Sequence, residues 1–155
     1  MKKFQTRLLV AFTLVILVLF SNCNKYEDGP AISLRTKKHR VCNSWRIDQV
    51  FETPQNGSQT DKTTDYKNAY VNYVMMINKS DLYTITYRPY NIGDYSETGS
   101  WYLSAGKSNL VFVNANGNGS SIGSVWTILR LKENELWMQT RNSNNVIIEV
   151  HLLPN

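Results

Sequence analysis

The chain has 155 residues, of which 42% are hydrophobic and 12% aromatic, so it can form one folded domain and is neither disordered nor collagen-like. Its formal net charge is +5, yet the residues from Ser44 to the end carry nine Lys/Arg and ten Asp/Glu, a net of -1. A nucleic-acid-binding domain needs its positive charge on the folded part, so this distribution argues against binding to DNA or RNA.

The N-terminal segment has the organisation of an export signal. Lys2, Lys3 and Arg7 precede a run over residues 8–20 that is apolar except for one Thr. As a helix these residues would span about 20 Å, which is short of the ~30 Å hydrocarbon core of a membrane. A basic start followed by a short apolar stretch and then polar residues predicts a secretory signal rather than a permanent membrane span.

Cys23 stands directly after this segment, in the sequence LFSNC. These residues resemble the lipobox of bacterial lipoproteins, where the Cys thiol receives a diacylglycerol, the preceding peptide bond is cleaved and the new N-terminus is acylated. The usual residue before the Cys is Gly, Ala or Ser, and this chain has Asn22. The resemblance implies that residues 1–22 are a signal peptide and that Cys23 is the lipid attachment site of an outer-membrane lipoprotein, facing the periplasm or the cell surface. The alternative is a plain secretory signal with an incidental cysteine.

Residues 23–42 are the predicted tether and lead-in segment. They are polar and charged, with a turn signal at residues 28–30 and a possible short helix at 35–40. We expect Val41 to pack against the outside of the domain and residues 24–42 to be dispensable for folding. Cys42 is expected to be a partly buried small hydrophobe, because lipidation of Cys23 leaves it without a disulfide partner. The basic run at 35–40 is interpreted as a solvated face with a secondary role at anionic head groups.

From Ser44 onward the chain consists of short alternating segments rich in β-branched and aromatic residues, separated by Asn, Gly, Ser and Asp. We predict strands at residues 44–52, 69–77, 82–88, 95–104, 109–114, 123–132, 135–141 and 145–153. No window after residue 44 has a convincing helix period. Eight consecutive antiparallel strands without an unpaired edge predict an all-β, eight-stranded antiparallel up-and-down barrel over residues 43–155.

Alternation along each predicted strand assigns its inward face. The inward sets are Trp45, Ile47 and Phe51; Tyr83, Ile85 and Tyr87; Tyr95, Glu97, Trp101 and Leu103; and Val146, Ile148, Val150 and Leu152. Glu97 would instead point to solvent if the register slips by one residue. The interior of such a barrel is just wide enough to be filled by side chains or to hold one small ligand.

Three parts of the sequence resemble the lipocalin-like lipoproteins of Gram-negative bacteria: residues 26–45, residues 99–101 (GSW), and residues 126–132 (WTILRLK) followed by 135–137 (ELW). The resemblance covers most of the mature chain and implies a lipocalin-like barrel. In that family a Trp in the first strand closes the barrel floor, and Trp45 occupies the matching place. The family usually has Gly two residues before this Trp, where this chain has Asn43.

Catalytic and cofactor patterns are weak. His39 and His151 are the only histidines, so the chain has few residues from which to build a Ser/His/Asp triad or a His-based metal site. We expect His151 to lie at the surface or the rim of the barrel. Residues 106–108 (GKS) lack the first Gly and the helix of a P-loop, and the Gly-rich residues 116–123 are interpreted as a flexible connection. We therefore expect no enzyme activity, no cofactor and no metal.

The aromatic residues have two possible uses, to line a ligand cavity or to fill a small barrel. The candidates are Tyr70, Tyr73, Tyr83, Tyr87, Tyr95, Trp101, Tyr102 and Trp126, among which Tyr83, Tyr87, Trp101 and Trp126 are the predicted ligand contacts. The limited interior of a barrel of about 110 residues favours filling. The predicted function is a monomeric, non-catalytic binding module for a small apolar or amphiphilic ligand. The alternative is a protein-interaction or scaffold module of a cell-envelope complex with a packed core, and an internal cavity would distinguish the two.

Overall fold

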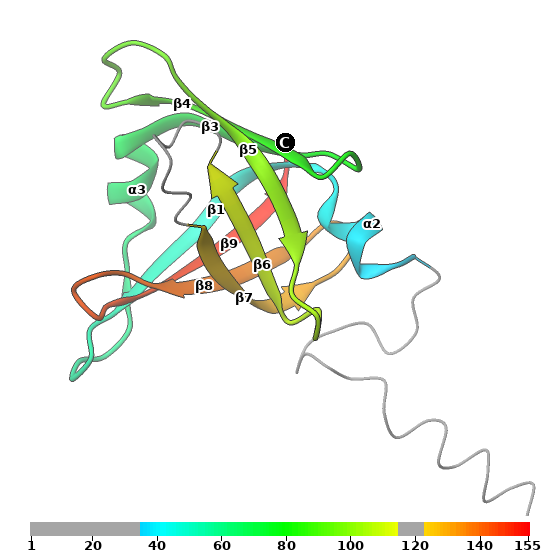
Figure 1. Cartoon of the computed structure of the whole chain (residues 1–155). Helices are drawn as coiled ribbons and strands as arrows, with labels where there is room; N and C mark the ends of the chain where they lie inside the picture. Colours follow the sequence, from blue (N-terminus) through cyan, green and yellow to red (C-terminus); the bar gives the residue numbers. More distant parts are fainter. Residues whose placement is uncertain (1–34, 115–122) are drawn as a thin grey trace, which may run out of the picture.

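The computed structural model describes residues 35–114 and 123–155, which fold into a closed antiparallel β-barrel (Figure 1). Its strands are β1 Ser44–Thr53, β2 Thr60–Asp61, β3 Tyr70–Ile77, β4 Leu82–Pro89, β5 Tyr95–Leu103, β6 Asn109–Asn114, β7 Ser124–Leu131, β8 Leu136–Arg141 and β9 Ile147–Pro154. The two helices are α2 Lys37–Val41 and α3 Thr63–Ala69. The predicted fold class is therefore confirmed, and each predicted strand lies within two residues of an observed one.

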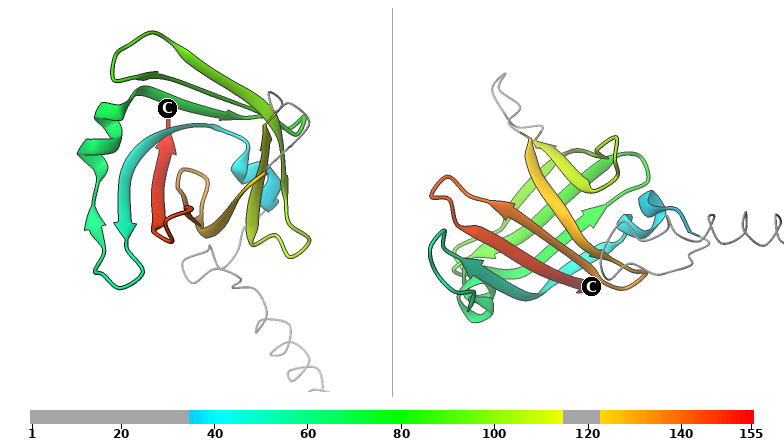
Figure 2. Two further views of the ribbon diagram at one scale, coloured as in Figure 1. Left: turned by 60° about the vertical axis from the view of Figure 1, so that its left-hand side comes forward. Right: turned by 90° about the horizontal axis from the view of Figure 1, so that it is seen from below.

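Pairing between the first and last strands closes the barrel. Neighbours follow the order β1-β3-β4-β5-β6-β7-β8-β9, and β9 pairs with β1 from Trp45↔Pro154 to Thr53↔Ile147. The short strand β2 is an addition at the far end of β1. The views in Figures 1 and 2 place α2 at one end of the barrel and α3 at the other. Within the described residues, no helix is long and apolar enough to cross a membrane.

The sequence did not predict α3, which joins β2 to β3. None of its residues is buried, so it lacks the apolar stripe that reveals a surface helix. Its position depends on contacts with β1: the Val50 N–H donates to the Thr63 hydroxyl at 3.0 Å, and the Lys62 N–H donates to the Val50 carbonyl at 2.8 Å. Such long-range contacts are invisible in a local pattern.

A β-bulge in β1 changes which residues face inward. The register of β1 against β9 shifts between Ile47 and Gln49, while Trp45 and Val50 are both fully buried. Since neighbouring strand residues point to opposite faces, Phe51 turns outward next to the inward-facing Val50. The predicted inward position of Phe51 is therefore wrong, because simple alternation does not register an extra residue.

Phe51 and its neighbours cover His151 on the outer face of β9. The His151 ring stacks on Trp137, with ring centroids 4.0 Å apart and planes at 7°, and lies 5.3 Å from the Phe51 ring. Its ring nitrogens face Glu149 Oε1 at 2.6 Å and Gln49 Oε1 at 3.2 Å. Only 8% of His151 is exposed. The expected surface or rim position is wrong, because two aromatic neighbours cover a residue that belongs to the outer face.

The α2 end of the barrel is plugged by side chains. Val41 and Trp45 are completely buried, and the Trp45 indole N–H donates to the Val41 carbonyl at 2.9 Å. The buried Arg40 guanidinium donates to the Leu131 carbonyl at 2.6 Å. The predicted short helix is present, but Val41 belongs to the core and not to the outer surface. The end of the lead-in segment is therefore part of the fold, which contradicts the idea that all of residues 24–42 is dispensable.

Replacing Trp45 with Ala should cause a large loss of stability. The substitution empties the floor of the barrel and leaves the Val41 carbonyl without its donor, and such truncations typically cost about 3–5 kcal/mol of a total of ~5–15 kcal/mol. Thermal unfolding followed by circular dichroism would measure the effect. Tyr102→Ala is the control, because Tyr102 is 53% exposed. Equal melting temperatures for the two variants would contradict the role of Trp45 as the plug.

Candidate functional site

A cavity of about 240 Å³ lies at the α3 end of the barrel. It is half enclosed, and its walls include Tyr66, Tyr70, Tyr73, Trp126, Ile148 and Val150. These side chains come from α3, β3, β7 and β9. Sites for drug-sized ligands usually measure about 300–1,000 Å³, so this cavity suits a smaller molecule.

The rest of the interior is packed. Large side chains from six strands fill the middle and the α2 end, among them Trp45, Met75, Tyr83, Trp101, Leu110 and Leu131. The two uses considered for the aromatic residues are therefore both present in one barrel. Packing occupies the α2 end, and the cavity lies at the α3 end.

Five tyrosine rings form a continuous row, in which Tyr66, Tyr70 and Tyr73 line the cavity and Tyr87 and Tyr95 extend the row beyond it. The contacts, as distances between ring centroids, are Tyr66–Tyr70 at 5.7 Å, Tyr70–Tyr73 at 6.5 Å, Tyr70–Tyr87 at 4.9 Å and Tyr87–Tyr95 at 4.7 Å. We call these residues the tyrosine wall. Tyr70 touches three of the others, which joins α3 to β3 and β4. Such a surface combines aromatic faces with phenol hydroxyls and is suited to amphiphilic molecules.

Two carboxylates accept hydrogen bonds from these phenols and their neighbour. The Tyr66 hydroxyl donates to Glu52 at 2.9 Å. The Tyr83 hydroxyl donates to Glu97 at 2.5 Å, and the Tyr95 hydroxyl lies 3.5 Å from the other oxygen of the same carboxylate. The predicted inward position of Glu97 is confirmed. Glu52 was missed as its acidic counterpart, because the bulge in β1 hides its orientation.

Neither Glu52 nor Glu97 forms an ion pair in the part of the chain that the structure describes. Lys62 is close enough for its charge to interact with Glu52, but it makes its ion pair with Asp65 at 3.0 Å. Both carboxylates are only partly exposed. At the cavity end of the barrel, both carboxylates are therefore held by tyrosine hydroxyls and not by ion pairs among the described residues.

Burial keeps the phenols of this region un-ionised. It raises the pKa of Tyr66, Tyr73 and Tyr83 well above the usual value of 10.0. The hydrogen bond to Glu52 adds to the rise in pKa for Tyr66, the hydrogen bond to Glu97 adds to it for Tyr83, and the charge of Glu97 adds to it for Tyr73. These hydroxyls therefore remain donors at any physiological pH.

Gly99 makes room for the Tyr83 ring. A Cβ at this position would lie 2.6 Å from Tyr83 Cε1 and 2.1 Å from the Val113 carbonyl oxygen. A side chain here would force the Tyr83 ring away from β5, and with it the hydroxyl that reaches Glu97. The glycine inside a strand pattern was the sequence signal for this close approach.

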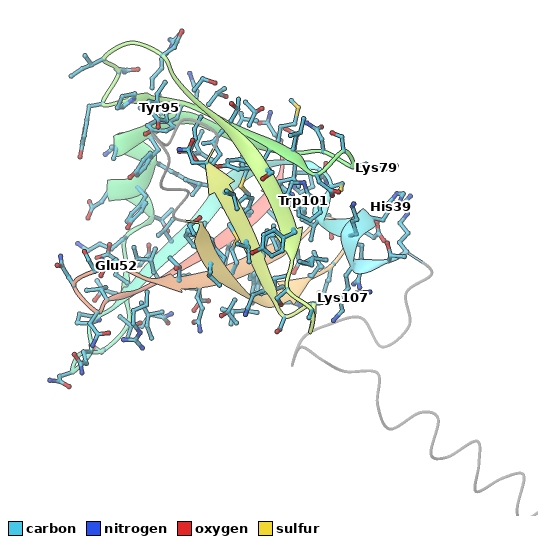
Figure 3. All side chains as sticks on the ribbon, viewed as in Figure 1. His39, Glu52, Lys79, Tyr95, Trp101 and Lys107 are labelled. Atoms are coloured by element: carbon cyan, nitrogen blue, oxygen red, sulfur yellow. The ribbon has the colours of Figure 1, made fainter. Side chains whose placement is uncertain are left out.

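The predicted ligand contacts separate into two groups. Trp126 lines the cavity and Tyr87 belongs to the tyrosine wall. Tyr83 is 1% exposed and packs against Phe112, so it reaches the site only through Glu97. Trp101 lies near the α2 end, away from Glu52 and Tyr95 (Figure 3), and its indole N–H donates to the Asn78 carbonyl at 2.9 Å. The predicted ligand contact at Trp101 therefore lies outside the cavity, because this ring is packed in the core near the α2 end.

Other candidates lie outside the cavity or outside the described residues. Tyr102 is 53% exposed and does not contribute to the cavity. Cys23, the signal peptide and most of the Gly-rich segment fall in residues 1–34 and 115–122, which the structure does not describe. Within residues 35–114 and 123–155, no three His, Cys, Asp or Glu side chains are grouped so as to hold a metal ion.

Among solved structures, the barrel is similar to a lipocalin-like protein from Bacteroides uniformis, with a TM-score of 0.50 and 8% sequence identity, over 75% of this chain and 99% of that chain. An uncharacterized protein from Bacteroides eggerthii gives a TM-score of 0.47 at 7% identity, over 73% of this chain and 98% of that chain. No protein-family model and no curated protein matches the sequence. The first likeness shows that the fold is a lipocalin-like barrel.

The raised phenol pKa values predict a loss of stability in alkali. Unfolded tyrosines ionise near pH 10 while the buried ones stay protonated, so above about pH 10 the unfolded state binds fewer protons and the free energy of unfolding falls as the pH rises. Urea denaturation between about pH 8 and 11 would show this fall. Tyr73→Phe should make the fall shallower, with Tyr102→Phe as the control. A stability that does not change over this range would contradict the burial of the phenols.

Proposed function

We propose that this protein is a non-catalytic, lipid-anchored barrel that binds a small amphiphilic molecule in the cavity at the α3 end. The observation that carries the proposal is the half-enclosed space of about 240 Å³ beside the tyrosine wall, in a barrel whose other end is plugged. Concave, largely apolar pockets with a few convergent polar groups are the usual form of small-molecule sites.

The lining indicates the general character of the ligand. Trp126, Ile148 and Val150 offer an apolar surface, and the phenols and carboxylates lie on the side of the tyrosine wall. A molecule with an apolar body and one polar end would satisfy both surfaces. A purely polar molecule would leave the apolar side unoccupied.

The lipid anchor at Cys23 is a proposal supported by the sequence. The described chain begins at Arg35, beside α2 and the plugged end of the barrel (Figure 1). An anchor before this point would hold the plugged end toward the outer membrane and leave the cavity at the opposite end. The basic residues of α2 would then lie near anionic head groups, to which such residues are attracted.

A protein-interaction or scaffold role is the second candidate. The observation in its favour is the loop between β4 and β5, where Tyr90 is 71% exposed and Ile92 is 79% exposed. Exposed apolar side chains at a loop tip are available to a partner protein. In this case the cavity would be incidental, and no small ligand would stabilise the barrel.

A thermal-shift screen would test the binding function. Fatty acids, sterol-like molecules, haem, amines and oligosaccharides would be added to the protein. A ligand present at a hundred times its dissociation constant should stabilise the fold by about 2.7 kcal/mol. Trp126→Ala should abolish or strongly reduce the shift because it removes a cavity wall, whereas Trp137→Ala, on the outer face, should preserve it. A screen without hits, or a shift unchanged in Trp126→Ala, would contradict binding in the cavity.

Replacing Cys23 with Ser should release the protein from the membrane. The substitution removes the thiol that would carry the acyl chains, and those chains supply most of the membrane affinity of a lipoprotein. Cell fractionation with detection of the mature chain would measure the release, and Cys42→Ser would be the matched control. If Cys23→Ser stays in the membrane fraction, the lipoprotein assignment is wrong.

A further inference from the structure

We propose that the ligand of this cavity carries a positively charged group, such as an amine or a quaternary ammonium, attached to a small apolar body. This inference rests on the proposed binding function and names the chemical class of the ligand. It is based on the two carboxylates, Glu52 and Glu97, on the aromatic character of the wall between them, and on the lack of basic side chains in the cavity lining.

The two carboxylates have hydrogen-bonding capacity that their tyrosine donors do not use. A carboxylate taken out of water is costly unless it is paired with a positive charge or well supplied with hydrogen bonds. Glu52 receives one tyrosine hydrogen bond, and Glu97 receives one short tyrosine hydrogen bond and one long one. An ionised carboxylate has about four acceptor sites, so both groups keep capacity for a further donor. An ammonium group held against the adjoining tyrosine rings would supply the missing positive charge.

The tyrosine wall offers aromatic faces to a cation. Cations bind over the faces of aromatic rings, and aromatic cages are the usual sites for quaternary ammonium groups. Tyr70 contacts three other rings of the wall, so several faces and edges are concentrated in one place. The raised phenol pKa values keep these hydroxyls as donors to the carboxylates, which fixes the carboxylates beside the rings.

The cavity lining disfavours an anionic head group. No Lys, Arg or His belongs to the cavity lining in the described part of the chain. Among the basic side chains near this end of the barrel, Lys62 pairs with Asp65 and Arg88 pairs with Asp94. Glu52 and Glu97 do not line the cavity themselves, but Glu52 accepts a hydrogen bond from Tyr66, which does, and Glu97 lies close enough for its charge to act on Tyr73. An acid in the cavity would lie beside this negative charge with no basic side chain in the lining, so acids should bind worse than amines of the same shape.

Three probes with the same phenethyl-type body separate charge from shape. They are phenethyltrimethylammonium as the cation, 2-phenylethanol as the neutral probe and 3-phenylpropionate as the anion. Each would be titrated into the purified full-length chain, with affinity measured by calorimetry and by quenching of tryptophan fluorescence, because Trp126 lines the cavity. We expect the cation to bind about tenfold more tightly than the alcohol, as charge-assisted contacts exceed neutral ones, and the anion to bind most weakly.

Isosteric variants assign the preference to the two carboxylates. Glu97→Gln and Glu52→Gln should each weaken binding of the cation about fivefold to tenfold while leaving the alcohol unchanged, because they remove charge and preserve shape. Glu133→Gln is the matched control, since Glu133 is an exposed carboxylate that pairs with Arg35 near the α2 end. Thermal unfolding of each variant would verify that it is folded.

The outcomes distinguish the inference from the function on which it rests. If the cation is preferred and both Gln variants remove the preference, the inference is supported. If all three probes bind equally, or if the Gln variants bind the cation as tightly as the unmodified chain, the inference is overturned while binding in the cavity stands. If no probe binds and the wider ligand screen is also negative, the proposed function itself fails.

Discussion

The hydrogen bond from the Trp45 indole N–H to the Val41 carbonyl oxygen determines which end of the barrel interior is filled by side chains and which end holds the cavity. It ties α2 to the start of β1 and holds two fully buried side chains across one end of the barrel. An eight-stranded barrel has room for filling side chains or one small ligand, but little more. The bulk of the core is fixed at the α2 end, and the cavity lies at the opposite end, where β1 leads toward β2 and α3.

Tyr83 marks the boundary between the packed and open halves. Its ring packs against Phe112 in the core and over Gly99, while its hydroxyl reaches Glu97 on the cavity side. A rigid core therefore positions a charged group of the candidate site. Well-packed side chains make such a position more exact than a mobile loop would, which is the usual requirement for a selective binding site.

The strands could be predicted because burial on one face imposes a period of two, and this period also placed Trp45 and Glu97 correctly. Features set by long-range contacts could not. The bulge between Ile47 and Gln49 reverses the facing of Phe51 and hides Glu52, and His151 is buried only because rings from two other strands meet over it. The candidate site could likewise be predicted only in part. Trp126 and Tyr87 were named from the aromatic composition, whereas Tyr66 lies on α3, a helix that the sequence did not predict.

The two ends of the barrel also differ in charge, although the barrel as a whole is nearly neutral. His39, Lys79 and Lys107 lie at the α2 end and Glu52 at the opposite end (Figure 3). An anionic membrane surface would attract the first end and repel the second, within the screening distance of about 8–10 Å. The same polarity would thus hold the cavity away from the lipid surface, toward the aqueous phase. There the carboxylates beside the cavity would increase the local concentration of small cations and disfavour anionic amphiphiles such as fatty acids.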